Sequence, residues 1–114
     1  MNEDIKLMMK IYSTYELDWM GDEIGDASSL TRHHIVKQEH GGLDDISNYA
    51  LLTQKSHQLL NFLEDNYVKE YEEINGMFLA LNRSLTFPSK EYYERMNSIL
   101  KKVRKSIKNK RRGR

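Results

Sequence analysis

The sequence contains no cysteine and only one proline among its 114 residues. The absence of cysteine excludes disulfides, thiol catalysis and thiolate metal sites, so any metal ligands must be imidazole, carboxylate or amide groups. No apolar stretch approaches the roughly 20 residues that a membrane helix needs, and MNEDIKLMMK lacks the basic and apolar regions of a signal peptide. We therefore expect a single domain, residues 1–114, in the reducing cytoplasm and without a membrane partner.

Acidic residues are missing from the C-terminal end, although the whole chain has a net charge of only +1. Residues 1–100 contain all 17 Asp and Glu but only nine of the 18 Lys and Arg, which gives this part a formal charge of −8. The last fourteen residues, KKVRKSIKNKRRGR, contain the other nine cations. This asymmetry predicts a basic helix end or tail over 101–114 that binds a polyanion. The alternative is a solvated helix end that only aids solubility.

Apolar residues recur at helical spacing through most of the chain. The predicted helices cover 3–15, 54 to at least 65, 66–82, and 89 onward into the basic end. Thr53 is a suitable N-cap for the second of these helices, and Gly76 is expected to kink or divide the third. The single proline, Pro88, marks the boundary before the last helix.

Two short segments have the composition of strands. β-branched residues predict one strand within 30–36, and Tyr49–Leu52 predicts another. Glycine and aspartate predict loops over 16–29 and 37–48, with Trp19 and Met20 pinning the first loop to the core. The expected fold class is mainly α with a small two-stranded antiparallel ribbon.

Three of the four histidines on the predicted strand–loop–strand–helix unit, together with its two asparagines, are candidate site residues. Adjacent side chains on a strand point to opposite faces, so His33 and His34 can do different work. A helix packed across a strand brings His57 against the end of that strand, where it can share one metal ion with His33. Asn61 lies four residues after His57 on the same helical face, and its carbonyl oxygen can supply a third ligand. This set leaves coordination positions open, as a catalytic site requires.

These residues resemble the HNH, or ββα-metal, endonucleases, which are also called His-Me finger nucleases. The resemblance depends on HHI in the first strand, GG in the loop, SNYALL leading into the second strand, and KSHQLLN in the helix. Order, spacing, residue identity and expected local structure agree over about 30 residues. The resemblance implies a ββα-metal module over residues 30–65 that is flanked by helices.

The resemblance also implies a role for each matched residue. His33 and His57 stand at metal-ligand positions, Asn61 at a third-ligand position, and His34 at the position of the general base. Asn48 stands where the family's asparagine fixes the loop and orients the base, and it or a neighbouring main-chain carbonyl is expected to hold the His34 ring. Histidine suits the base because it titrates near neutral pH. The implied cofactor is one divalent ion, Mg²⁺, Mn²⁺, Ni²⁺ or Zn²⁺, which contacts the scissile phosphate and the leaving oxygen.

The sequence departs from the family pattern at two points. Many members have a proline shortly after HHI, where this chain has Val36-Lys37-Gln38. Many members also carry a four-cysteine zinc site, so bracing here must come from the flanking helices. Gly41 and Gly42 predict a turn with positive φ, and His40 matches no family position.

Cationic residues extend the nuclease hypothesis to DNA binding. Arg32, Lys37 and Lys55 lie close to the predicted site in sequence and are expected to hold nearby phosphates. The basic end is expected to grip the DNA backbone without reading its sequence. The residues concerned are Lys101, Lys102, Arg104, Lys105, Lys108, Lys110, Arg111 and Arg112. The sequence thus predicts a metal-dependent HNH endonuclease that hydrolyses DNA phosphodiester bonds, of a type that the resemblance associates with bacteria and phages.

A hypothesis of another class stays open, because each histidine taken singly is more often structural than catalytic. A catalytically inactive ββα module could act as a nucleic-acid-binding or protein-binding regulator. The presence of His34 and Asn48 favours the enzyme, since a pure binder needs neither. A homodimer through the apolar faces of 66–82 or 89–107 would place two active sites on the two strands of a duplex.

Overall fold

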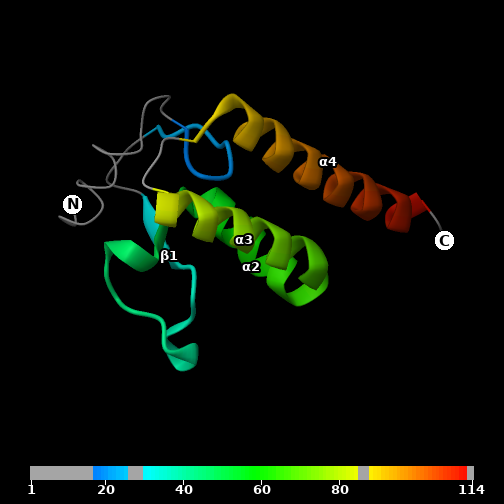
Figure 1. The fold of residues 1–114 in the computed structure, drawn as a ribbon. Helices are drawn as coiled ribbons and strands as arrows, with labels where there is room; N and C mark the ends of the chain where they lie inside the picture. The colour runs from blue at the N-terminus through cyan, green and yellow to red at the C-terminus, as the bar shows by residue number, and fades with distance from the viewer. Residues whose placement is uncertain (1–16, 26–29, 85–87, 113–114) are drawn as a thin grey trace.

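Within residues 17–25, 30–84 and 88–112, which the computed structural model describes, the chain forms a two-stranded antiparallel ribbon and three α-helices (Figure 1). The elements are β1 (Thr31–His34), β2 (Tyr49–Leu52), α2 (Gln54–Asn66), α3 (Val68–Ser84) and α4 (Lys90–Arg112). The predicted mainly helical fold with an antiparallel ribbon is confirmed. The predicted helix over 3–15 lies outside the described residues.

The ribbon pairs the two histidines of β1 with the start of β2. His34 lies opposite Tyr49, and Thr31 lies opposite Leu52. All four residues of β2 are buried, whereas in β1 only His33 is. The connection between the strands, predicted as a plain loop, contains two single 3-10 turns, η2 (Gln38–His40) and η3 (Ile46–Asn48).

A buried carboxylate ties the segment before the ribbon to the start of α2. Thr53 caps α2 as predicted, because its hydroxyl accepts a hydrogen bond from the Ser56 amide. Asp18, which is 0% exposed, accepts hydrogen bonds from the amides of Met20 and Asp22, each at 2.8 Å, and from the amide of Thr53 at 2.9 Å. Asp18 therefore accepts hydrogen bonds from backbone amides next to it in the sequence and from the amide of Thr53, which lies 35 residues away.

Replacing Asp18 with alanine is expected to lower the free energy of unfolding by about 2 to 3 kcal/mol, because buried backbone amides lose their acceptor. Urea unfolding at pH 7 measures this. Asp65→Ala, which removes an exposed carboxylate from α2, serves as the control and should change stability by less than about 0.5 kcal/mol. Equal effects of the two variants would contradict the role assigned to Asp18.

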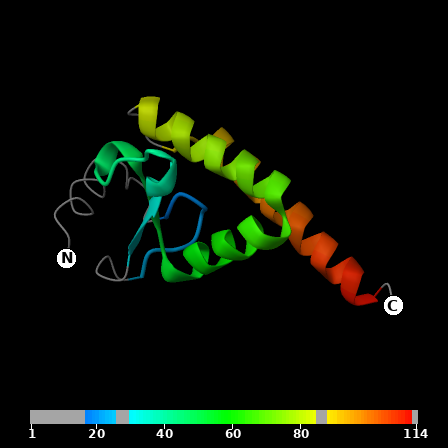
Figure 2. The ribbon, with the colours of Figure 1, turned by 90° about the horizontal axis from the view of Figure 1, so that it is seen from below.

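The helices form a V around the ribbon. Figure 2 shows α2 and α3 meeting at a corner, with the ribbon in the open end of the V and α4 extending past the corner. The corner falls at Tyr67, which follows α2 with φ −140° and ψ 62°, while α3 continues through Gly76 without the expected division. Among the described residues, no helix is both long and apolar enough to cross a membrane.

The core lies between the ribbon and the three helices. Trp19 and Met20 are 2% and 3% exposed, which confirms that they anchor the first loop. The Trp19 ring packs against Phe78 of α3, and the Trp19 carbonyl accepts a hydrogen bond from Tyr92 of α4 at 2.6 Å. Other buried core residues include Leu51, Leu52, Leu60, Leu63, Ile74, Met96, Ile99, Leu100 and Val103.

Candidate functional site

His33 and His34 point into different surroundings, as alternation along a strand predicts. His33 is 8% exposed and its ring is surrounded by aromatic rings. The His33 ring centroid lies 6.0 Å from that of His57 in α2, 5.7 Å from that of Phe78, and 6.5 Å from that of Tyr71. The structure thus brings together the two predicted imidazole ligands.

A hydrogen bond to a side chain of α3 determines which nitrogen of His33 is free. Asn75 donates through Nδ2 to the Ile35 carbonyl at 2.7 Å, so its Oδ1 is the atom that faces His33 Nε2 at 2.8 Å. An amide oxygen only accepts, so Nε2 must carry the proton. The lone pair of His33 therefore lies on Nδ1.

The same reasoning gives the opposite tautomer for His57. Thr31 donates its single hydroxyl proton to the Leu52 carbonyl at 3.0 Å. Its Oγ1 lies 2.7 Å from His57 Nδ1 and can then only accept, so Nδ1 carries the proton. The lone pair of His57 lies on Nε2.

Both rings are neutral at pH 7, which leaves these lone pairs available. Burial lowers the pKa of His33 to about 4, against the hydrogen bond to Asn75, which acts to raise it, and the nearby His57 lowers it further. Burial also lowers the pKa of His57. Two imidazoles bound to one ion at about 2 Å place their ring centroids roughly 5 to 6 Å apart, and the spacing of His33 and His57 fits that range.

The third ligand predicted from the sequence is less well placed. Asn61 lies one turn after His57 on α2 and is exposed. Within the described residues, no group of three or more His, Cys, Asp or Glu side chains could hold a metal ion. A cation held here would have two imidazole ligands, with water, Asn61 or substrate oxygens completing the set.

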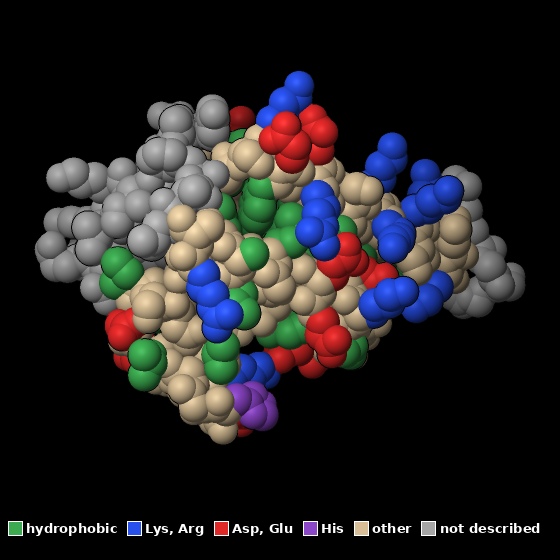
Figure 3. Space-filling view, viewed as in Figure 1, with side chains coloured by type: hydrophobic (Ala, Val, Ile, Leu, Met, Phe, Trp, Pro, Cys, Tyr) green, Lys and Arg blue, Asp and Glu red, His purple; other side chains and the backbone are tan. Residues whose placement is uncertain are grey.

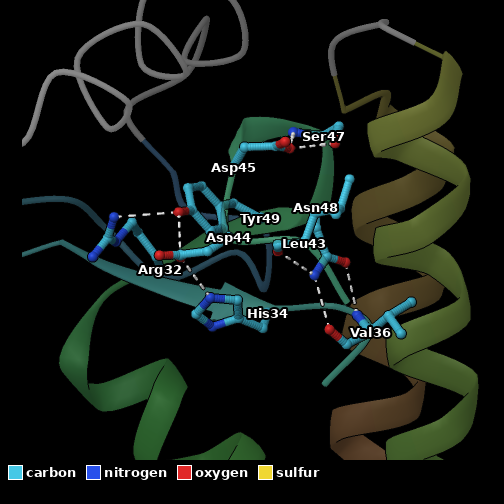
Figure 4. Close-up of polar contacts among 9 residues, drawn as sticks. All are labelled: Arg32, His34, Val36, Leu43, Asp44, Asp45, Ser47, Asn48 and Tyr49. Carbon is cyan, nitrogen blue, oxygen red and sulfur yellow. Dashed lines mark hydrogen bonds and ion pairs between the residues drawn. The ribbon is translucent and has the colours of Figure 1, made fainter. Parts of the chain in front are cut away.

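His34 lies near a carboxylate and a tyrosine that the sequence did not assign to the site (Figure 4). Its Nε2 lies 2.9 Å from Asp44 Oδ1, and the same oxygen accepts a hydrogen bond from the Tyr49 hydroxyl at 2.6 Å. The other ring nitrogen of His34 points away from Asp44 (Figure 4). Arg32, predicted to bind DNA, donates to the Tyr49 hydroxyl at 3.3 Å and lies over the Tyr49 ring.

Asn48 braces the loop instead of holding His34. Its side chain accepts from the Val36 amide at 2.8 Å and donates to the carbonyls of Val36 and Leu43 at 2.8 and 2.9 Å. The expected role in fixing the loop fits these contacts, but the ring partner of His34 is Asp44. The difference arises because the Asn48 side chain points into the loop, where its amide is used on backbone groups (Figure 4).

The two loop glycines are required for different reasons. Gly41 has φ +87°, as the sequence predicted for the turn. Gly42 does not have positive φ; a Cβ there would lie 1.8 Å from the Val36 carbonyl oxygen and 2.9 Å from Asn48 Nδ2. Gly42 thus permits the close approach on which the Asn48 contacts depend. His40 is exposed beside Gly41, which fits its expected place in the loop.

The two lysines predicted to hold phosphates near the cut face acidic side chains. Lys37 forms an ion pair with Glu64 of α2, and that hydrogen bond raises the pKa of Lys37. Lys55 is 85% exposed in its side chain and lies 3.9 Å from Asp22. Lys55 is therefore the freer of the two to meet a phosphate.

The basic end predicted as a helix end or tail is helical through Arg112. Its hydrophobic residues pack on the body, and the Lys110 ammonium lies over the Tyr67 ring at 4.9 Å. Blue side chains gather over this part of α4 in Figure 3. The exposed cations are Lys101, Lys102, Arg104, Lys105, Lys108 and Lys110; the side chains of Arg111 and Arg112 lie outside the described residues.

The basic end of α4 and the ribbon lie at opposite ends of the molecule in both Figure 1 and Figure 2. The molecule measures 48 Å along its longest axis. Most of these cations are therefore far from the histidines, but Arg104 is nearer, because it lines a pocket with Lys55 and Ser56 at the start of α2.

The histidine rings are held by three residues that were not predicted from the sequence as their partners. Thr31 lies two residues before His33 on the same face of β1, so strand alternation could have identified it. The position of Asp44 could not be predicted from its spacing in the sequence, because it depends on the shape of the loop. Asn75 lies 42 residues from His33 and carries no local signal.

Comparison with protein-family models, with curated proteins and with solved structures found no match for this chain. The support for a function therefore comes from the residues and geometry described above.

Proposed function

We propose that this protein is a metal-dependent endonuclease of the HNH type that hydrolyses phosphodiester bonds in DNA. The observation that carries the proposal is the pairing of His33 and His57. Their rings are close and neutral at pH 7, and their hydrogen bonds leave a lone pair on His33 Nδ1 and on His57 Nε2.

His33 Nδ1 and His57 Nε2 would hold the cation. A divalent ion bound there would supply positive charge to offset the charge that develops on the phosphoryl and leaving oxygens. His34, on the adjacent strand position, acts as the general base. It takes a proton from water, the water oxygen bonds to phosphorus, and the bond from phosphorus to the 3′ oxygen breaks. The products are a 5′ phosphate and a 3′ hydroxyl.

The exposed cations of α4 support DNA as the substrate. Six of them lie within residues 101–110 of one helix, and a backbone-binding surface of this kind needs no base contacts. The cations toward the end of α4 would grip a stretch of backbone away from the cut, whereas Arg104, which lines a pocket with Lys55, would grip backbone closer to it. Lys55, near the start of α2, is the cation we assign to phosphates closer to the histidines.

A plasmid-nicking assay tests the proposal. Wild-type protein is incubated with supercoiled DNA and Mg²⁺, Mn²⁺ or Ni²⁺, and open-circular and linear products are quantified. We expect cleavage that EDTA abolishes, and a loss of at least roughly 100-fold in His34→Ala, because the general base is removed. His40→Ala changes an exposed histidine in the loop that follows β1 and should cleave like the wild type.

Two outcomes contradict the proposal. If wild-type protein leaves DNA intact with all three metals but binds it in a salt-sensitive way, the chain is a binding module without catalysis. If His34→Ala and His40→Ala both cleave like the wild type, His34 is not the base.

A further inference from the structure

Asp44 holds one nitrogen of His34 and is itself held from the other side. Asp44 Oδ1 lies 2.9 Å from His34 Nε2 and accepts from the Tyr49 hydroxyl at 2.6 Å. The hydrogen bond from Tyr49 has the larger effect in lowering the pKa of Asp44, and the contact with His34 lowers it further. Asp44 is therefore ionised at neutral pH. An ionised carboxylate only accepts hydrogen bonds, so His34 Nε2 must be the protonated nitrogen.

The partners of Asp44 are fixed by the ribbon. Tyr49 is 1% exposed and lies directly opposite His34 in the strand register, with the two rings perpendicular at 5.4 Å. The Arg32 guanidinium donates to the Tyr49 hydroxyl and lies 5.2 Å from the centre of its ring. The hydroxyl proton of Tyr49 is thereby directed to Asp44. The chain of contacts runs from Arg32 through Tyr49 and Asp44 to His34 (Figure 4).

We propose that Asp44 is the positioning residue for His34: it holds the Nε2–H tautomer and leaves Nδ1 as the atom that accepts the proton of the attacking water. This inference rests on the proposed nuclease function. Proton transfer to Nδ1 makes the ring an imidazolium, and the Asp44 carboxylate stabilises that positive charge at Nε2. Loss of the carboxylate therefore removes both the orientation of the ring and the charge that balances it.

Nitrogen-15 NMR of the histidine rings tests the tautomer in resting protein, without DNA or metal. We expect wild-type His34 to be in the Nε2–H form at pH 8. Asp44→Ala should give a mixture of the two forms. Asp44→Asn should favour Nδ1–H, because an amide nitrogen can donate to Nε2. Asp45→Asn changes the neighbouring carboxylate, which accepts from Ser47, and is the matched control that should keep the wild-type form.

Nicking kinetics then test the catalytic consequence. With the same series, we expect kcat to fall about 10- to 100-fold in Asp44→Ala and further in Asp44→Asn, with KM nearly unchanged. Asp44 has a side chain that is 57% exposed, so both variants should fold, and their thermal unfolding checks this. Asp44→Glu should recover part of the lost kcat and of the Nε2–H form.

The outcomes separate this inference from the proposed function. An unchanged His34 tautomer in Asp44→Ala overturns the positioning role, whatever the activity. A changed tautomer with unchanged kcat in an active enzyme overturns the catalytic part. An inactive wild-type protein overturns the proposed function and, with it, the catalytic part, while the tautomer measurement still decides the structural part.

Discussion

Replacing Lys101, Arg104, Lys105 and Lys108 together with glutamine is expected to weaken DNA binding by roughly 100- to 1,000-fold at low salt. These four residues are spaced i, i+3, i+4 and i+7, so they form one stripe along α4, and all are exposed. Each phosphate contact that they make releases a counterion. The slope of log K against log salt concentration should therefore decrease by about 3 to 4.

Fluorescence anisotropy with a labelled duplex, measured over a salt series, gives both the affinity and the slope. The matched control replaces Lys69, Arg83, Lys90 and Arg95 with glutamine. It removes the same amount of charge from exposed cations elsewhere on α3 and α4. If both quadruple variants weaken binding equally, net charge alone explains the binding, and the stripe on α4 is not a binding surface.

Acidification from pH 7 to 4.5 is expected to lower the free energy of unfolding by about 2 to 3 kcal/mol through His33 alone. The unfolded chain protonates this histidine near the ordinary histidine pKa of 6.5, whereas the folded protein does so only near a pKa of about 4. The unfolded state therefore binds more protons between these values. The contribution of neutral His33 to the free energy of unfolding is fully present above pH 6.5 and is lost as the pH falls toward 4.

Urea unfolding of the wild type and His33→Gln at pH 7 and 4.5 isolates this contribution. His33→Gln cannot titrate, so its stability should depend less on pH than that of the wild type by about 2 to 3 kcal/mol. His40→Gln removes an exposed histidine and should keep the wild-type dependence. A wild-type curve parallel to that of His33→Gln would show that His33 is not buried as a neutral ring.

The elements that the sequence predicts well are those set by neighbouring residues. Tyr49–Leu52 forms the second strand as predicted, and Thr53 caps the helix that follows, because both depend on side chains within a few residues. The pairing of His33 with His57 also follows from local geometry, since a strand and the helix packed on it limit where these side chains can lie.

The partners of the histidines could not be predicted in the same way. Asn75 lies on a helix whose amphipathic pattern does not distinguish a polar residue facing solvent from one facing the ribbon. Asp44 depends on a loop shape that the amide of Asn48 and the close approach at Gly42 determine together. Each of these contacts is a consequence of tertiary packing and leaves no periodic signal in the sequence.

Polar contacts join the ribbon region to segments that are distant in the sequence. Asp18 reaches Thr53 across 35 residues, and Asn75 and Asn82 reach the ribbon region across 40 and 33 residues. Contacts between residues so far apart in the sequence close large loops, and the entropic cost of closure must be met before the contact contributes any stabilisation. Residues 30–65 contain both histidines, but Asp18, Asn75 and Asn82 all lie outside them. The geometry of the histidine pair therefore depends on segments of the domain that lie outside the 30–65 unit containing both histidines.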